Sequence, residues 1–136
     1  FTINFVARRG INKRFVLENK TFYLNSNFKV EDEKLDNNFQ MLTNQTKILF
    51  KSKKFINSNL IGNFVSPNLK SNDNYFFLDY EIEFTPKNKN LSYSLIGKNL
   101  TNNKVFTTNS ISSFSSNDSS HNLIERYVMF KVTFGF

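Results

Sequence analysis

The segment from Tyr127 to Phe136 alternates large apolar residues with other residues from end to end, and this alternation restricts the fold more than any other feature of the chain. Successive side chains of a β-strand point to opposite faces, so a period of two predicts a strand. One face of this strand is expected to carry Val128, Phe130, Val132, Phe134 and Phe136. So continuous an apolar face must be covered by protein or by lipid, which restricts the chain to sheet-forming folds.

The same period recurs between Asn74 and Thr85. The apolar positions there are Phe76, Leu78, Tyr80, Ile82 and Phe84. The opposite face carries a column of carboxylates, Asp79, Glu81 and Glu83. A short polar turn at 86–90 separates this strand from another, predicted over Leu91 to Asn99, so the two are expected to form a hairpin.

Looser alternation predicts four further strands upstream. Their ranges are Phe1–Arg8, Thr21–Val30, Phe39–Phe50 and Phe55–Ser66. In the second of them we expect one face to carry Phe22, Leu24, Phe28 and Val30, opposite Asn25, Asn27 and Lys29. The total is about seven strands of about 8–12 residues, close to the ~9–11 residues of a tilted transmembrane strand.

The composition requires that apolar and polar side chains be separated in space. Phe supplies 17 of the 136 residues, yet Asn, Ser, Lys and Thr fill most other positions. Cys is absent, which excludes disulfides and thiolate metal sites within these residues. No apolar run approaches the ~20 residues that a transmembrane helix needs. The net charge of +7 fits a surface for nucleic acid or anionic lipid, or a solvated lysine-rich surface.

Short and long connections alternate along the predicted strands. Short turns are expected near 9–19, 51–54 and 86–90, and longer polar connections at 31–38, 67–73 and 100–126. The tract Arg9–Lys20 is ambiguous, and an early start of the second strand within it stays open. The basic residues at the short turns are Arg8, Arg9, Lys13, Arg14, Lys51, Lys53, Lys54, Lys87 and Lys89, whereas Glu31, Asp32, Glu33 and Asp36 gather at a long connection. Short periplasmic turns and long extracellular loops are typical of outer-membrane barrels. The longest connection, from Leu100 to Arg126, is interpreted as a mobile surface loop.

Few residues have the pattern of a chemical site. The carboxylate column could bind a cation, but pairing with lysines of the adjacent strand, Lys98 among them, is the simpler interpretation. His121 is the only histidine, and the serines between 110 and 120 have no paired base. We therefore predict no catalytic residue, no metal site and no cofactor, and hence no enzyme. The apolar faces carry almost no charge, which disfavours nucleic acid as a partner.

Two segments of the chain resemble the TonB-dependent receptors of bacterial outer membranes. The first contains Asn99, Leu100 and Asn102, and the second runs from Arg126 through the alternating strand at the end of the chain. In that family an Asn-Leu-x-Asn/Asp motif closes the penultimate strand, and a long loop and an Arg precede the final strand. Glu125 departs from the family pattern, which often has Pro at that position.

The terminal strand also resembles the signal that the barrel-assembly machinery reads in this family. Its residues are Val128, Phe130, Val132, Phe134 and Phe136. The resemblance implies an all-β fold, an antiparallel transmembrane β-barrel, of which residues 1–136 form the C-terminal part, about seven strands of about 22. The family's plug domain lies outside this part. An odd number of strands also predicts further strands, since bacterial single-chain barrels have an even number.

The function that the resemblance implies is energy-coupled uptake of a bulky nutrient such as a metal chelate, a glycan or a peptide. The implied partners are outer-membrane lipid, the barrel-assembly machinery, the TonB complex acting through an N-terminal region, and a possible surface lipoprotein. The implied location is the outer membrane, with the C-terminus in the periplasm. Two alternatives remain open, a small structural or adhesive outer-membrane barrel and a soluble secreted all-β binding module.

Overall fold

The computed structural model describes residues 1–29, 36–52, 55–70, 73–87, 90–111 and 116–135. The strands in these ranges are β1 (Thr2–Gly10), β2 (Phe15–Lys29), β3 (Asp36–Lys51), β4 (Ile56–Ser66), β5 (Tyr75–Phe84), β6 (Leu91–Lys98), β7 (Val105–Ile111), β8 (Ser116–Asn122) and β9 (Tyr127–Phe134). Within them the chain forms no helix, and hence none long and apolar enough to cross a membrane. The prediction of an all-β fold is confirmed.

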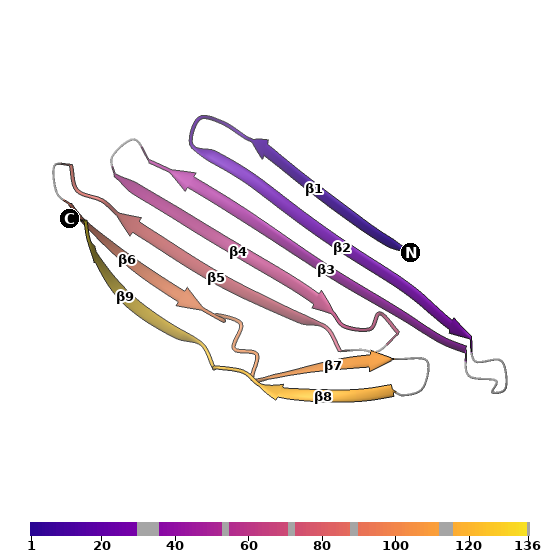
Figure 1. Ribbon diagram of the computed structural model, residues 1–136. Coiled ribbons are helices and arrows are strands. Elements are labelled where there is room, and N and C mark those ends of the chain that lie inside the picture. The colour runs from indigo at the N-terminus through magenta and orange to yellow at the C-terminus, as the bar shows by residue number, and fades with distance from the viewer. Residues whose placement is uncertain (30–35, 53–54, 71–72, 88–89, 112–115, 136) are drawn as a thin grey trace.

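Seven of these strands form one antiparallel sheet in the order β1-β2-β3-β4-β5-β6-β9. Neighbours in space are neighbours in sequence except where the β7–β8 hairpin is inserted between β6 and β9 (Figure 1). The sheet is not closed, so β1 and β9 are its two edges. The fold is therefore a curved antiparallel meander.

One of the sequence-based boundaries was wrong. The segment from Leu100 to Arg126, expected to be a loop, contains β7 and β8, because Val105–Ile111 pairs in register with Ser116–Asn122. The first turn, expected near 9–19, spans 11–14, and the second strand begins early, at Phe15, which is the alternative that the sequence left open. Asn12 closes this turn by accepting hydrogen bonds from the backbone N–H groups of Arg14 and Phe15 at 2.8 and 3.0 Å. Such a side-chain acceptor explains a tight turn without Gly at its centre.

Successive connections between the strands of the sheet lie at opposite ends of it. At one end, here called the turn end, β1, β3 and β5 end and β2, β4 and β6 begin. At the other, the loop end, β2, β4 and β6 end and β3, β5 and β9 begin, with the β7–β8 hairpin between β6 and β9. This separation follows from the meander order, because each strand reverses direction relative to the last. The charges predicted at Lys53, Lys54, Lys89, Glu31, Asp32 and Glu33 lie outside the described residues.

The register gives the sheet two chemically different faces. Residues that pair across antiparallel strands share a face, so the pairing lists assign each side chain to one of two sets. One set, the charged face, contains Arg8, Glu18, Lys20, Lys47, Lys51, Asp79, Glu81, Glu83, Lys98 and Lys131. The other set is the apolar face. Among strand residues with described side chains, Arg9 is its only charged member, one residue before β1 ends.

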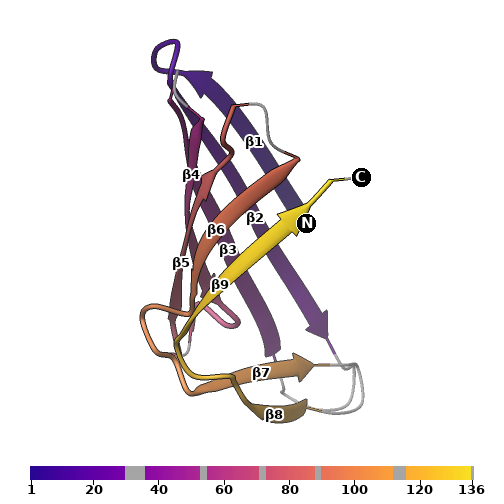
Figure 2. The same cartoon turned by 90° about the vertical axis from the view of Figure 1, so that its left-hand side faces the viewer.

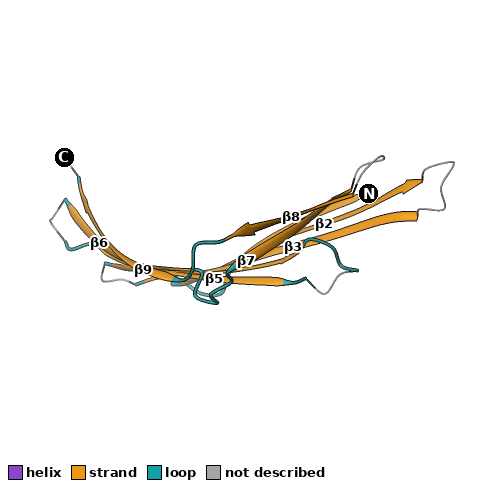
Figure 3. Cartoon of the chain, turned by 90° about the horizontal axis from the view of Figure 1, so that it is seen from below, coloured by secondary structure: helices purple, strands orange, loops and turns teal. Residues whose placement is uncertain are grey.

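The apolar face is half-buried on β2 and β4 and largely exposed on β1, β5 and β9. None of the described hydrophobic side chains is fully buried. The four phenylalanines that best represent this face, Phe76, Phe84, Phe130 and Phe134, are 49%, 43%, 65% and 64% exposed. Figures 2 and 3 show that the sheet is curved and that the β7–β8 hairpin lies on its concave side. The charged face is the concave one, because Phe106 of the hairpin contacts Tyr75 and Phe77, which belong to that face.

On the two longest strands, β2 and β3, apolar residues occupy only part of the apolar face. On β2 this part runs from Phe15 to Tyr23, and on β3 from Phe50 back to Leu42. Beyond that length, toward the loop end, the same face carries Asn25, Asn27 and Gln40. A transmembrane strand needs about 9–11 residues, which is the length of this apolar part.

Phe22 and Leu24 share one face of β2, opposite Asn25 and Asn27, as predicted. That face is the charged one, because Phe22 pairs with Thr43 and shares its side of the strand with Lys20. The side chain of Phe28 and all of Val30 lie outside the described residues. The apolar side chains of β2 therefore change face near Tyr23, odd positions toward the turn end and even positions toward the loop end.

A closed network of polar side chains interrupts the apolar face at the middle of β2 and β3. Asn19 donates to Thr46 (2.9 Å) and Asn44 (3.4 Å), and Asn44 donates to Thr21 (2.7 Å) and Asn19 (3.3 Å). The hydroxyls of Thr21 and Thr46 donate to Asn19 and Asn44 at 3.0 and 3.1 Å. Every N–H and O–H of the four side chains therefore has an acceptor inside the network, which avoids the cost of an unpaired donor.

Asn44→Ala is expected to destabilise the sheet, because it leaves the Asn19 amide without its partner. The expected loss is about 1–3 kcal/mol, measured as a lower denaturant midpoint with an unchanged slope. Thr43→Ala is the matched control, because the neighbouring Thr43 lies on the opposite face and its side chain makes no hydrogen bond within the described residues. Equal losses in the two variants would contradict a special role for the network.

Candidate functional site

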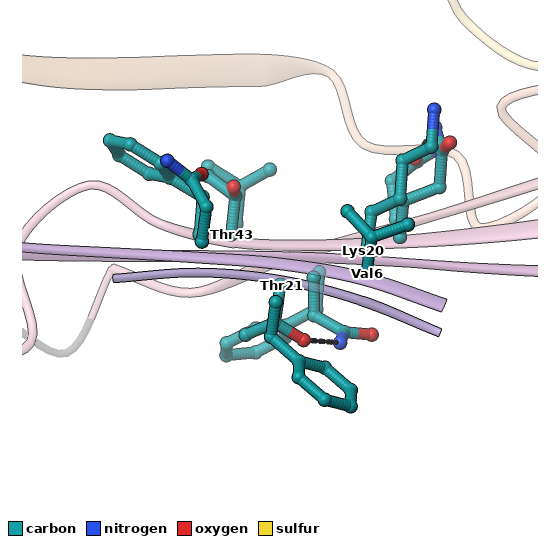
Figure 4. A pocket seen from close by; sticks show the side chains of 12 residues that line it. Val6, Lys20, Thr21 and Thr43 are labelled. Atoms are coloured by element: carbon teal, nitrogen blue, oxygen red, sulfur yellow. Dashed lines mark hydrogen bonds between the residues drawn. The ribbon is translucent and has the colours of Figure 1, made fainter. Parts of the chain in front are cut away.

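A hollow lies on the charged face at the middle of β2 and β3. It has a volume of about 330 Å³ and crosses β1, β2, β3 and β4. Its floor is the backbone of Phe5, Thr21, Asn44 and Phe64, whose side chains point to the apolar face. Figure 4 shows Val6, Lys20 and Thr43 on one side of the strands and Thr21 on the other.

Two cross-strand rows of side chains form the walls of this hollow. The row nearer the loop end is Asn4, Phe22, Thr43 and Val65. The row nearer the turn end is Val6, Lys20, Gln45 and Asn63. The rows combine three amides, one hydroxyl, one ammonium group and one aromatic ring. These groups can hydrogen-bond, pair with an anion and pack against C–H groups, which is the chemistry of a ligand-binding surface.

The same two rows continue onto β5, where an aromatic cluster begins. Val65 pairs with Tyr75 and Asn63 pairs with Phe77. The Phe106 ring of β7 packs against Tyr75 and Phe77 with ring centroids 4.8 and 6.3 Å apart. The Tyr75 hydroxyl also accepts a hydrogen bond from the backbone N–H of Thr107 at 3.0 Å. The hairpin is thereby fixed beside the hollow, on the charged face.

The predicted carboxylate column lies on the charged face, further from the loop end. Asp79 forms an ion pair with Lys98 of β6, with 2.8 Å between Oδ2 and Nζ. Glu83 accepts a hydrogen bond from Asn57 at 3.4 Å, and Glu81 pairs across the sheet with Asn59. Among the described residues there is no group of three or more His, Asp or Glu side chains that could hold a metal ion.

The residues of the Asn-Leu-x-Asn motif come together at the end of β6. Asn99 and Asn102 both have positive φ, 49° and 58°, a conformation that Asn tolerates better than most residues. The Asn99 backbone N–H donates to Asp79 at 2.9 Å, and that of Leu100 donates to the carbonyl of Leu78 at 2.8 Å. The motif therefore turns the chain sharply while remaining bonded to β5.

Asn99 and Asn102 also bind the segment that returns from the hairpin to β9. The Asn99 amide donates to the carbonyls of Asn103 and Ile124 at 2.8 and 2.9 Å. The Asn102 side chain accepts a hydrogen bond from the backbone N–H of Arg126 at 3.1 Å. These contacts, here called the Asn clasp, hold both ends of the hairpin segment at one point.

The clasp is tied to β5 by two further side chains. Thr101 and Asn103 both donate to the carbonyl of Phe76, at 2.6 and 2.7 Å. An ion pair between Lys104 and Glu125, with 3.2 Å between Nζ and Oε1, joins the two arms of the segment just beyond. Glu125, where the resembled family often has Pro, therefore has a structural partner here.

The residues predicted to form an assembly signal lie along a free edge of the sheet, on β9. Val128, Phe130, Val132 and Phe134 lie on the apolar face, and all four are exposed. One side of β9 is hydrogen-bonded to β6, whereas its other side pairs with no described strand. Phe136 lies outside the described residues. His121 of β8 contacts the Ser119 hydroxyl at 3.1 Å, and the predicted serine run falls largely outside the residues with described side chains.

Sequence reasoning named the clasp residues and the carboxylate column but missed the hollow. The predicted strand began at Thr21, so its pattern did not show that Lys20 and Glu18 share the face of Phe22. Extending the alternation back to Lys20 and Glu18 shows the signal that was available, since both have the same parity as Phe22. A face that contains Glu, Lys and Phe in succession is mixed, not apolar.

Comparison with known proteins adds no relative. No family model matches the chain, and no curated protein or solved structure matches it either.

The Asn clasp predicts a graded response to substitution of Asn99. Asn99→Ala removes its side-chain hydrogen bonds and strains the positive φ, so it should destabilise the clasp by about 2 kcal/mol. Asn99→Gly removes the same hydrogen bonds but tolerates the positive φ, so about half of that loss should remain. Hydrogen exchange of the backbone amides in 103–126 measures both, since an opened clasp exposes them. Unchanged exchange in both variants would show that the aromatic contacts alone hold the hairpin.

Proposed function

We propose that this chain forms part of the wall of an outer-membrane β-barrel transporter similar to the TonB-dependent receptors. The observation that carries the proposal is the pairing of a convex apolar face, on which Arg9 is the only charged strand residue with a described side chain, with a concave charged one. In water an apolar surface this extensive is unfavourable, because contiguous exposed apolar patches rarely exceed a few hundred Å². Against hydrocarbon the same surface needs no further cover.

The position of the aromatic side chains supports the same proposal. At the turn end of the apolar face, Phe15 packs on Phe50 with centroids 4.8 Å apart, and Tyr93 lies between Phe84 and Phe130 at 6.5 and 6.1 Å. At the loop end Tyr23 contacts Phe1 at 5.7 Å. Aromatic girdles at both borders of an apolar band are typical of outer-membrane barrels.

The two ends of the sheet fit the two sides of an outer membrane. The turn end has short connections, with Lys13, Arg14 and Lys87 among their residues, which would meet anionic lipid headgroups favourably. The loop end has the hairpin, and it would face the exterior. In this arrangement the C-terminal residues of β9 lie on the periplasmic side.

The role proposed for these residues is structural and ligand-contacting, not catalytic. The apolar face contacts lipid, the charged face lines the interior, and the loop end receives the nutrient. The energy-coupling partner, the plug and the remaining strands would come from the rest of such a transporter. The barrel-assembly machinery would engage β9, because a free strand edge can pair with another sheet.

Spin labels on single cysteines test the membrane placement, and the absence of Cys from these 136 residues keeps the labelling specific. The intact protein in bilayers is labelled at Leu60, on the apolar face, or at the adjacent Asn59, on the charged face. The Leu60 label should collide with lipid-dissolved oxygen and be shielded from a water-soluble nickel complex. The Asn59 label should show the reverse, because its face is expected to line a wet interior.

Asn27 supplies the matched control for this experiment. It lies on the same face as the apolar residues of β2 but beyond Tyr23, toward the loop end. The nickel complex should therefore reach a label at Asn27, although it does not reach a label at Leu60. Nickel accessibility at both Leu60 and Asn59 would favour a soluble all-β module, and shielding of Leu60 from both reagents would indicate a closed protein interior. Either result would overturn the proposal.

A further inference from the structure

We propose that the hollow across β1–β4 binds the carboxylate of a small, hydroxyl-rich acid, a sugar acid in chemical class, with Lys20 as the group that selects for the negative charge. The inference rests on the proposed function in one respect, since it requires the charged face to be wet. It goes further by assigning a ligand class to one place on that face.

Lys20 brings a positive charge to the wall of the hollow. Glu18, its nearest acidic neighbour on the same side of β2, is engaged by Arg8 with 3.0 Å between Oε1 and Nε. Within the described part of the chain Lys20 has no ion pair, and it is exposed at the wall of the hollow. A cation without a carboxylate partner is available for an anionic group of a ligand.

Several polar side chains surround Lys20 in the hollow. Gln45 donates its amide to Asn63 Oδ1 at 2.8 Å, which leaves the Asn63 amide hydrogens and the Gln45 oxygen for other partners. Across the hollow, neither Asn4 nor Thr43 uses its side chain in a hydrogen bond within the described residues. These groups provide both donors and acceptors on two sides of one space, as a ligand with several hydroxyl groups requires.

The hollow has an aromatic wall and a small volume. The Phe22 ring forms part of the wall opposite Lys20 and supplies the one aromatic surface of the hollow. The C–H face of a sugar ring packs on such a surface, while the ring hydroxyls point outward to hydrogen-bonding groups. A volume of about 330 Å³ is at the small end of ligand sites, which fits a single sugar unit rather than a long chain. Figure 4 shows the space between Thr43 on one side and Lys20 with Val6 on the other.

The test compares two probes that differ only at C6, galacturonate with a carboxylate and galactose with a hydroxymethyl group, titrated into the intact protein in lipid nanodiscs by calorimetry or ligand-observed NMR. Galacturonate should bind the unchanged protein at least about tenfold more tightly than galactose, because only galacturonate can form the ion pair. Lys20→Met should remove this preference and leave galactose binding as it was. Lost galactose binding in Lys20→Met would mean a damaged hollow, and Lys20→Arg should then restore the preference for galacturonate.

Lys47→Met is the control for general charge attraction, because Lys47 lies one cross-strand row beyond the hollow on the same face. The preference for galacturonate should survive this change. An equal loss in Lys47→Met and Lys20→Met would show a diffuse positive field rather than a site, and absence of preference in the unchanged protein would overturn the inference outright. The spin-label measurement at Leu60 and Asn59 separates the two proposals, because it reports membrane placement whether or not galacturonate binds.

Discussion

Pairing register is the constraint on which the whole sheet depends. Antiparallel strands alternate their side chains, so a slip of one residue moves every side chain to the other face. A slip of β5 relative to β4 would bring Asp79, Glu81 and Glu83 onto the apolar face beside Leu60. With no fully buried hydrophobic side chain among the described residues, no core is present to fix the register. The separation of charged from apolar side chains must do so.

The register of the β2–β3 pair needs a further constraint, because its apolar residues change from one face of the sheet to the other. Toward the turn end its apolar residues lie on the apolar face, and toward the loop end Phe22 and Leu24 lie on the charged face. Hydrophobic pattern alone therefore does not define one register across the whole pair. The closed network of Asn19, Thr21, Asn44 and Thr46 lies at this change and bonds in only one register. Because its donors are internally satisfied, the network suits a site facing hydrocarbon better than four isolated polar residues would.

The sequence predicted the fold where alternation was strict and failed where it was not. The strands at Tyr75–Phe84 and Tyr127–Phe134 were predicted within two residues at each end, because one face is wholly apolar. The β7–β8 hairpin was missed, because Ser, Thr and Asn fill both of its faces and leave no periodic signal. At the candidate site the motif identified Asn99 and Asn102 but not their bonds. The hollow depends on cross-strand rows, and these appear only once the register is known.

The free edges of the sheet set a condition on anything that closes it. Both β1 and β9 run from the loop end to the turn end, because Thr2 pairs with Leu24 and Tyr127 with Lys98 at the loop end. Direct pairing of β9 with β1 would therefore be parallel, unlike every other pair in the sheet. Antiparallel closure requires an odd number of additional strands, which gives the even total of bacterial barrels. In hydrocarbon each unpaired edge group costs several kcal/mol, so the proposed membrane placement and a closing set of strands stand or fall together.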